Sequence, residues 1–153
     1  MKKSTIIILS ISAILVIGGG FTLGYFLLNP LGGTNEELTP GTVLKSGNFV
    51  VMDGSHYGSG TVNVVVIEGG DVELQLVDVD IANGPDLYIY LSYKSIFSGV
   101  TDDTGIKADL GELPYNSGNF SVSIHPLINI TNYNSVLIWC LQFSVVFTYA
   151  TLA

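Results

Sequence analysis

The sequence predicts an all-β protein, a single small β-sandwich or partly closed barrel that follows an N-terminal transmembrane helix. Three observations lead to this prediction. Segments with apolar residues at every second position recur between residues 47 and 153, turn-forming residues separate them, and no amphipathic helix of useful length follows residue 28. Seven or eight short strands with regular turns are typical of sandwiches and small barrels.

The first 28 residues are predicted to be a membrane anchor. Lys2 and Lys3 precede residues 6–28, a run of 23 residues without a charge, which is long enough to span a bilayer core of about 30 Å. Lysines on the N-terminal side place the N-terminus in the cytoplasm and the remainder outside the cell membrane, in a single-pass arrangement. An uncleaved signal-anchor is favoured, and a signal peptide cleaved after the small residues 18–20 is the alternative.

Residues 29–46 are predicted to be a stalk, because they contain Pro30, Pro40 and three glycines and show little apolar periodicity. Residues 47–153 then form one domain. From residue 29 onward the chain has three lysines, no arginine and 13 carboxylates, a formal net charge of −10. This charge excludes nucleic-acid binding and is consistent either with solubility alone or with attraction of a cationic partner or calcium.

The strands are expected in five segments with different burial. Alternation indicates half-buried strands in three of them, and β-branched and aromatic residues indicate inner strands in the other two. In chain order the segments are residues 61–67, 72–76, 87–91, 120–124 and 135–147. Turn signals lie at residues 53–54, 69–71, 83–85 and 117–119.

The last expected strand contains the only cysteine, Cys140, beside the only tryptophan, Trp139. A regular strand places Trp139, Leu141, Phe143 and their alternate neighbours on a fully hydrophobic core face, and Cys140 on a mixed face. A lone thiol cannot close an internal disulfide, although it permits pairing between two chains. Two interpretations stay open: an inert core residue and a reactive group.

Several sequence blocks resemble the DM-thirteen domain, the extracellular module of Skeletor-type proteins that often accompanies DOMON and cytochrome-b-like domains. Two blocks are the most specific: Gly84-Pro85-Asp86-Leu87, and residues 138–147, which read IWCLQFSVVF. The other matching blocks, in order and spacing, are residues 47–49, His56, 59–61, 90–92, 109–113 and Ala150. The resemblance covers the domain from residue 47 to residue 152.

The resemblance implies a redox accessory domain for electron transfer, with Cys140 as a bare thiol or as the residue that holds a prosthetic group. His56 and Trp139 are the candidate neighbours of that site. One departure is Thr148, where many members of the family have a small residue. The alternative function is a non-catalytic cell-surface binding or adhesion module in which Cys140 only packs. Membrane contact through residues 6–28 and a redox partner protein or surface ligand are the expected interactions.

Metal binding has weaker support in the sequence, and no cofactor is assigned. His56, His125, Cys140 and Met52 are the donor types of a blue-copper site, but no histidine or methionine follows Cys140 at the usual spacing. No haem-attachment motif is present. Asp78, Asp80 and Asp86 flank one turn and are candidate calcium ligands, although turn stabilisation by Asp86 is the preferred interpretation.

Two further features concern modification and catalysis. Asn119-Phe120-Ser121 and Asn129-Ile130-Thr131 are acceptor motifs for N-glycosylation on the expected extracytoplasmic side. No arrangement of residues points to hydrolytic or transfer chemistry, so independent catalytic turnover is not expected.

Overall fold

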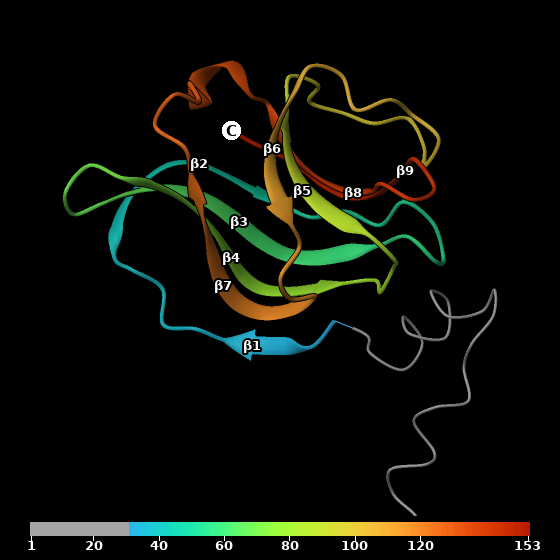
Figure 1. Ribbon diagram of the computed structural model, residues 1–153, viewed down its shortest axis with the longest axis horizontal. Helices are drawn as coiled ribbons and strands as arrows, with labels where there is room; N and C mark the ends of the chain where they lie inside the picture. Colours follow the sequence, from blue (N-terminus) through green and yellow to red (C-terminus); the bar gives the residue numbers. More distant parts are fainter. Residues whose placement is uncertain (1–30) are drawn as a thin grey trace, which may run out of the picture. The chain divides into compact units, whose positions relative to one another are not determined.

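The computed structural model describes residues 31–153, which fold into two β-sheets packed face to face (Figure 1). The strands are β1 (Gly33–Asn35), β2 (Gly41–Asn48), β3 (Gly58–Ile67), β4 (Val72–Ile81), β5 (Leu87–Ser92), β6 (Lys107–Glu112), β7 (Ser117–Ile124), β8 (Ser135–Cys140) and β9 (Val145–Thr151). A short 3₁₀ helix, η1, spans Ile130–Asn132. The predicted all-β fold is confirmed, and the two sheets form a sandwich and not a closed barrel.

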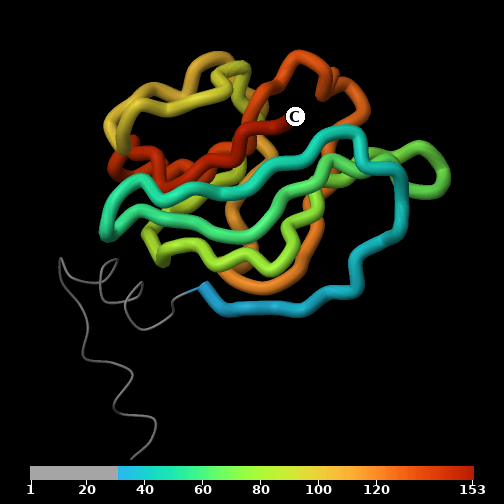
Figure 2. The backbone as a smooth tube through the Cα atoms, turned by 180° about the vertical axis from the view of Figure 1, so that it is seen from behind, coloured from blue at the N-terminus to red at the C-terminus, as the bar shows by residue number. Residues whose placement is uncertain are grey.

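The first sheet has the strand order β1-β7-β4-β3-β2, and the second sheet has the order β6-β5-β8-β9. All neighbours are antiparallel except β1 and β7, which are parallel. The two sheets are joined at one edge, where β2 of the first sheet meets the chain that follows β9 of the second. There Ser46 and Ala153 exchange two backbone hydrogen bonds of 3.0 Å. Figure 2 shows β2 beside the C-terminal strand from behind.

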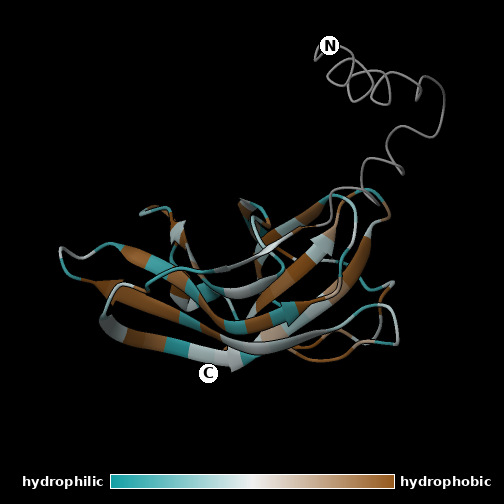
Figure 3. Ribbon diagram, turned by 90° about the horizontal axis from the view of Figure 1, so that it is seen from below, coloured by the Kyte–Doolittle hydropathy of each residue, from teal (hydrophilic) through white to brown (hydrophobic). Residues whose placement is uncertain are grey.

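The main core lies between the sheets and is built from the alternating apolar residues of the central strands. Val62, Leu74, Leu76, Ile89 and Phe120 have no exposed surface. Their burial follows from the period-two pattern, which places every second side chain on the inner face. Figure 3 shows hydrophobic residues concentrated along the strands of both sheets.

The predicted membrane helix, residues 6–28, lies outside the described residues. Within residues 31–153 the structure contains no helix with the length and apolar character needed to cross a bilayer.

The segment expected as a stalk, residues 29–46, contains β1 and most of β2, so much of it belongs to the first sheet. Sequence patterning does not reveal β2, because this edge strand leaves Val43 and Leu44 about half exposed and is held by backbone bonds to β3. Thr39, just before β2, accepts a hydrogen bond of 2.6 Å from the side chain of Gln75, and Gln75 is buried.

The expected long strand at residues 135–147 is wrong, because the structure divides it into β8, a turn at residues 141–144, and β9. Leu141 and Phe143, predicted to lie in the core, are 45% and 60% exposed. The face that carries Cys140 is the main core face and not a mixed one. Both faces of β8 are buried, because the second is covered by the connection between β5 and β6, so a hydrophobicity pattern cannot distinguish them.

Candidate functional site

Cys140 is the last residue of β8 and has no exposed surface. In the second sheet it lies between Leu87 of β5 and Val145 of β9. Its side chain belongs to the main hydrophobic core, together with Ile138 and Phe147. The four residues that follow it are all exposed, so the sulfur is buried directly beside a surface turn.

The thiol of Cys140 is buried in the core but contacts polar backbone groups. It donates a hydrogen bond to the carbonyl oxygen of Pro85, with an Sγ–O distance of 3.0 Å. Burial raises the pKa of the Cys140 thiol, the backbone N–H groups of Phe143 and Gln142 oppose that shift, and the charge of Asp86 adds to it. The resting form at neutral pH is therefore the protonated thiol.

Two turns enclose the sulfur, and each contains a residue with a left-handed backbone. Asp86 has φ 60° and Ser144 has φ 53°. A hydrogen bond of 2.9 Å from the backbone N–H of Leu141 to the carbonyl oxygen of Asp86 connects the two turns. Residues other than glycine rarely adopt this backbone conformation without a cost in free energy, so the surrounding structure must hold both turns in place.

The predicted motif at residues 84–87 forms the first of these turns. A Cβ at Gly84 would clash with the ring of Phe147, so only glycine allows this approach. Leu87 is buried in the main core. The motif therefore positions the Pro85 carbonyl group that binds the thiol.

His56 lies in the loop between Phe49 and β3, away from the hydrogen bonds of Cys140. Its Nδ1 is 2.8 Å from Oδ1 of Asp53, and its ring packs edge-on against Phe147 with a centroid distance of 4.8 Å. Backbone N–H donation from Ser55 is the largest cause that lowers the pKa of Asp53, followed by the side chain of His56. Phe147 thus contacts both His56 and the Gly84 turn.

The candidate metal ligands are not gathered into one site. Residues 31–153 contain no group of three or more His, Cys, Asp or Glu side chains placed to hold a metal ion. The aspartates Asp78, Asp80 and Asp86 do not form such a group, and neither do His56, His125 and Cys140. Around the sulfur itself the structure places the carbonyl oxygen of Pro85 and core side chains.

Trp139 points to the opposite face of the second sheet from Cys140. It belongs to the outer cluster, which we define as Tyr90, Phe97, Leu137, Trp139 and Val146, with Met52, Tyr88 and Tyr149 packed against it. Sequence analysis did not find this cluster as a site, because its members come from separate strands and a loop. The alternation that places Leu137 and Trp139 on one hydrophobic face was the signal for part of it.

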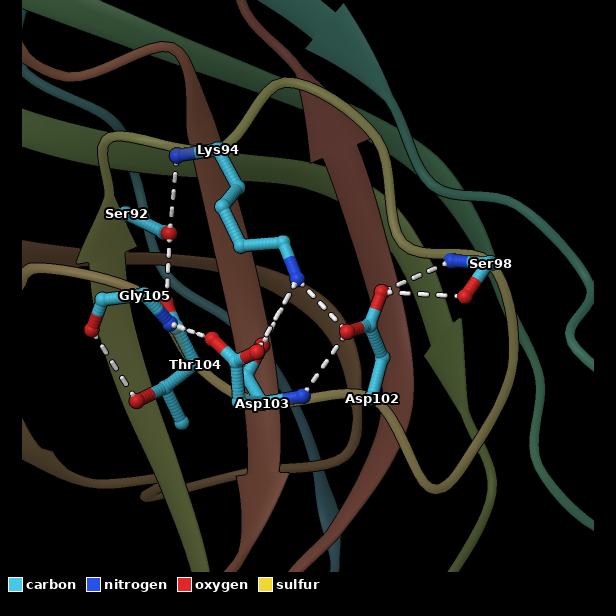
Figure 4. A network of polar contacts seen from close by, with 7 residues as sticks. All are labelled: Ser92, Lys94, Ser98, Asp102, Asp103, Thr104 and Gly105. Carbon is cyan, nitrogen blue, oxygen red and sulfur yellow. Dashed lines mark hydrogen bonds and ion pairs between the residues drawn. The ribbon is translucent and has the colours of Figure 1, made fainter.

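The connection between β5 and β6, residues 93–106, covers the outer cluster through Phe97. An ion pair holds it: Lys94 Nζ is 2.6 Å from Oδ1 of Asp102 (Figure 4). Asp102 also accepts hydrogen bonds from the N–H and hydroxyl groups of Ser98. The Lys94 hydrogen bond is the largest cause that holds the pKa of Asp102 far below its ordinary value of 3.8.

This ion pair predicts that the loop loosens in acid. A carboxylate whose pKa is lower in the folded than in the unfolded protein stabilises the fold at a pH above its unfolded-state pKa. This stability is lost as the pH falls below about 4 toward the folded-state pKa. Fluorescence of the only tryptophan, Trp139, should report that loosening as the pH is lowered. Asp102→Asn should remove the acid-dependent step. Asp103→Asn is the matched control, because its side chain is 81% exposed and 3.7 Å from Lys94; an equal effect of both variants would contradict the prediction.

The two glycosylation motifs lie in different surroundings. Asn129 is exposed and caps η1, where its side chain accepts from the N–H group of Thr131. Asn119 is half-buried in β7, and its side-chain oxygen accepts a hydrogen bond of 2.7 Å from the N–H of Asp78. Glycosylation at either position stays a prediction.

The comparisons with known proteins agree with the resemblance seen in the sequence. The family model described as "Electron transfer DM13" matches residues 49–152, a range that includes both turns around Cys140 and the outer cluster. No curated protein and no solved structure matches the chain. Because the match covers more than half of the 153 residues, the chain belongs to the DM13 family of electron-transfer domains.

Proposed function

We propose that this chain is a membrane-tethered, extracytoplasmic electron-transfer domain in which Cys140 is the redox group and acts as a bare thiol. The observation that carries this proposal is the position of the sulfur. It lies immediately under the exposed turn at residues 141–144, with backbone N–H groups of that turn directed at it. A sulfur in such a place is one local opening away from solvent or a partner.

The redox step follows from the protonated resting state. The thiol of Cys140 gives one electron to an oxidised one-electron carrier on a partner protein and releases its proton to water at the opened turn. One electron from a reduced carrier and one proton restore the thiol. Exposed Leu141 and Phe143 provide apolar surface for such a partner beside the sulfur.

The tether rests on the sequence. Residues 6–28 carry no charge and follow two lysines, which supports an uncleaved anchor with a cytoplasmic N-terminus. The formal charge of −10 over the remaining chain favours a cationic partner over an anionic one.

The competing function is a non-catalytic binding module. Complete burial of Cys140 in the main core favours it, because buried free cysteines commonly serve as small apolar residues. The two functions differ in whether the sulfur exchanges electrons while the protein stays folded.

The test uses the full chain in detergent micelles, purified with metals supplied. Its absorption spectrum and metal content are recorded, and the electron equivalents that it gives to hexachloroiridate(IV) are then titrated. We expect Cys140→Ser to give one equivalent less than the wild type, because serine retains the shape and the hydrogen-bond donor but not the oxidisable sulfur. Circular dichroism checks that the variant is folded.

Ser135→Ala is the matched control. Ser135 is equally buried at the other end of β8 and donates to the carbonyl oxygen of Lys94, so this variant removes a buried polar group without touching the sulfur. It should give as many equivalents as the wild type. Equal values for the wild type and Cys140→Ser would overturn the proposal and leave the binding module.

A further inference from the structure

Tyr88 has surroundings that none of the other described tyrosines shares. It lies on the outer face of β5, where its partners across the strands are Trp139 of β8 and Glu112 of β6. Its hydroxyl donates a hydrogen bond to Oε1 of Glu112 at 3.2 Å. Among residues 31–153 this is the one tyrosine hydroxyl that donates to a carboxylate. A phenol bonded to a carboxylate has a proton acceptor in place when it loses an electron.

Tyr90, two residues further along the same face, has the opposite environment. The rings of Tyr88 and Tyr90 are 6.2 Å apart between centroids. Nζ of Lys107 lies 3.8 Å from the centroid of the Tyr90 ring, and Tyr90 is buried. An ammonium group over the ring stabilises the electron-rich ground state, so it opposes removal of an electron from Tyr90.

The charges around Tyr88 favour electron loss. Burial and then the hydrogen bond and charge of Glu112 raise the pKa of Tyr88, and the charges of Asp86 and Asp109 add to this shift. Carboxylates that disfavour a phenolate anion also stabilise positive charge left when the ring loses an electron, by the same Coulomb interaction. The one other charged residue of β6 is Lys107, and its ammonium group lies over the ring of Tyr90.

We propose that Tyr88 is a second redox residue, which relays single electrons from the Cys140 side of β8 to an acceptor at the surface and uses Glu112 as its proton acceptor. The relay deepens the proposed function and rests on it for the electron donor. Trp139 connects the two residues, because it neighbours Cys140 in the chain and Tyr88 across the sheet.

The step balances at Tyr88. The ring gives one electron to an oxidised transition-metal centre on a partner protein, and the phenolic O–H bond breaks as its proton moves to the carboxylate of Glu112. The product is a neutral tyrosyl radical beside a protonated carboxyl group. The thiol of Cys140 then gives one electron to the ring and releases its own proton to water at the opened turn, while Glu112 returns the first proton to the Tyr88 oxygen.

The test oxidises the full chain in detergent micelles with hexachloroiridate(IV) in stopped flow, and freeze-quenched samples are examined by electron paramagnetic resonance. We expect a tyrosyl radical in the wild type and at least a tenfold loss of its yield in Tyr88→Phe. Tyr90→Phe is the matched control on the same strand and should stay within twofold of the wild type. Equal losses in both variants, or no loss in Tyr88→Phe, would overturn the relay.

Glu112→Gln tests the proton transfer. This variant should slow radical formation at least fivefold at pH 7 and make its rate rise with the concentration of buffer base, whereas the wild-type rate should not depend on buffer. A wild-type rate that depends on buffer to the same degree would overturn the role of Glu112.

Cys140→Ser separates the relay from the function on which it rests. If the relay receives electrons from Cys140, the Tyr88 radical forms at the wild-type rate in this variant but lives at least tenfold longer. A Tyr88 radical with an unchanged lifetime would support the Tyr88 site and overturn Cys140 as its donor. If no Tyr88 radical forms but Cys140 still gives its electron equivalent, the relay is overturned and the proposed function is retained.

Discussion

Gly60→Ala should destabilise the domain by about 3 kcal/mol, because two separate costs fall on one residue. Gly60 lies in β3 with φ 92°, a left-handed conformation that costs an alanine about 1–2 kcal/mol. The added Cβ would also lie 2.5 Å from the carbonyl oxygen of Asp78 and 2.7 Å from Cα of Val79. These are backbone atoms of the neighbouring strand β4, so the clash can be relieved only by moving a central strand. Urea unfolding followed by Trp139 fluorescence measures the loss.

Gly69→Ala is the control for that prediction. Gly69 has φ 97°, nearly the same backbone conformation, but no atom lies within 4 Å of the Cβ that alanine would add. Its cost should therefore be about 1 kcal/mol, which is the conformational part alone. Equal losses of unfolding free energy in the two variants would show that the close approach of β3 and β4 at Gly60 contributes nothing.

Ser144→Val should speed modification of the Cys140 thiol about 30-fold in the folded protein. Ser144 has φ 53°, and a β-branched side chain in that conformation costs about 2 kcal/mol, which corresponds to a 30-fold larger population of the opened turn. The measurement is the labelling rate of the full chain by a thiol reagent without denaturant. Because burial raises the pKa of the thiol, the rate in every variant should keep rising with pH above the ordinary thiol range near 8.5.

Two variants show which opening exposes the sulfur. Gln142→Val changes an exposed residue of the same turn that has no left-handed backbone, and it should leave the labelling rate unchanged. Gly60→Ala lowers global stability without touching the turn, and it should also leave the rate unchanged. If Gly60→Ala speeds labelling in proportion to its loss of stability, the sulfur is exposed only by global unfolding and the local opening of the turn is contradicted.

The sequence was sufficient to predict those strands that have one face on the core and one face away from it. Leu87, Ile89 and Leu91 alternate with less hydrophobic residues because their strand has an inner and an outer face, and all three are buried as expected. β2 was assigned to a stalk because an edge strand is held by its backbone, and backbone hydrogen bonds leave no side-chain pattern.

The surroundings of Cys140 were harder to predict. The turn that covers it contains Leu141 and Phe143 and no glycine or proline, so it has the composition of a strand. Its left-handed residue is a serine, and one serine between apolar residues is a weaker turn signal than glycine or asparagine. The contact between Tyr88 and Glu112 depends on the register of β5 and β6, and a connection of 14 residues separates these strands. Such a register follows from the packed loop and not from local sequence.

The parallel pairing of β1 with β7 has a mechanical consequence. β1 has only three paired residues, whereas β2 pairs with β3 along most of its eight residues. A pulling force applied at residue 31 therefore loads β1 first and detaches it before β2. Release of residues 31–40 frees a segment with an extended length of roughly 33 Å, at about 3.3 Å per residue, while the sandwich around Cys140 stays folded. β1 is thus the element that yields first under tension, and its release protects the proposed site at Cys140 from the load.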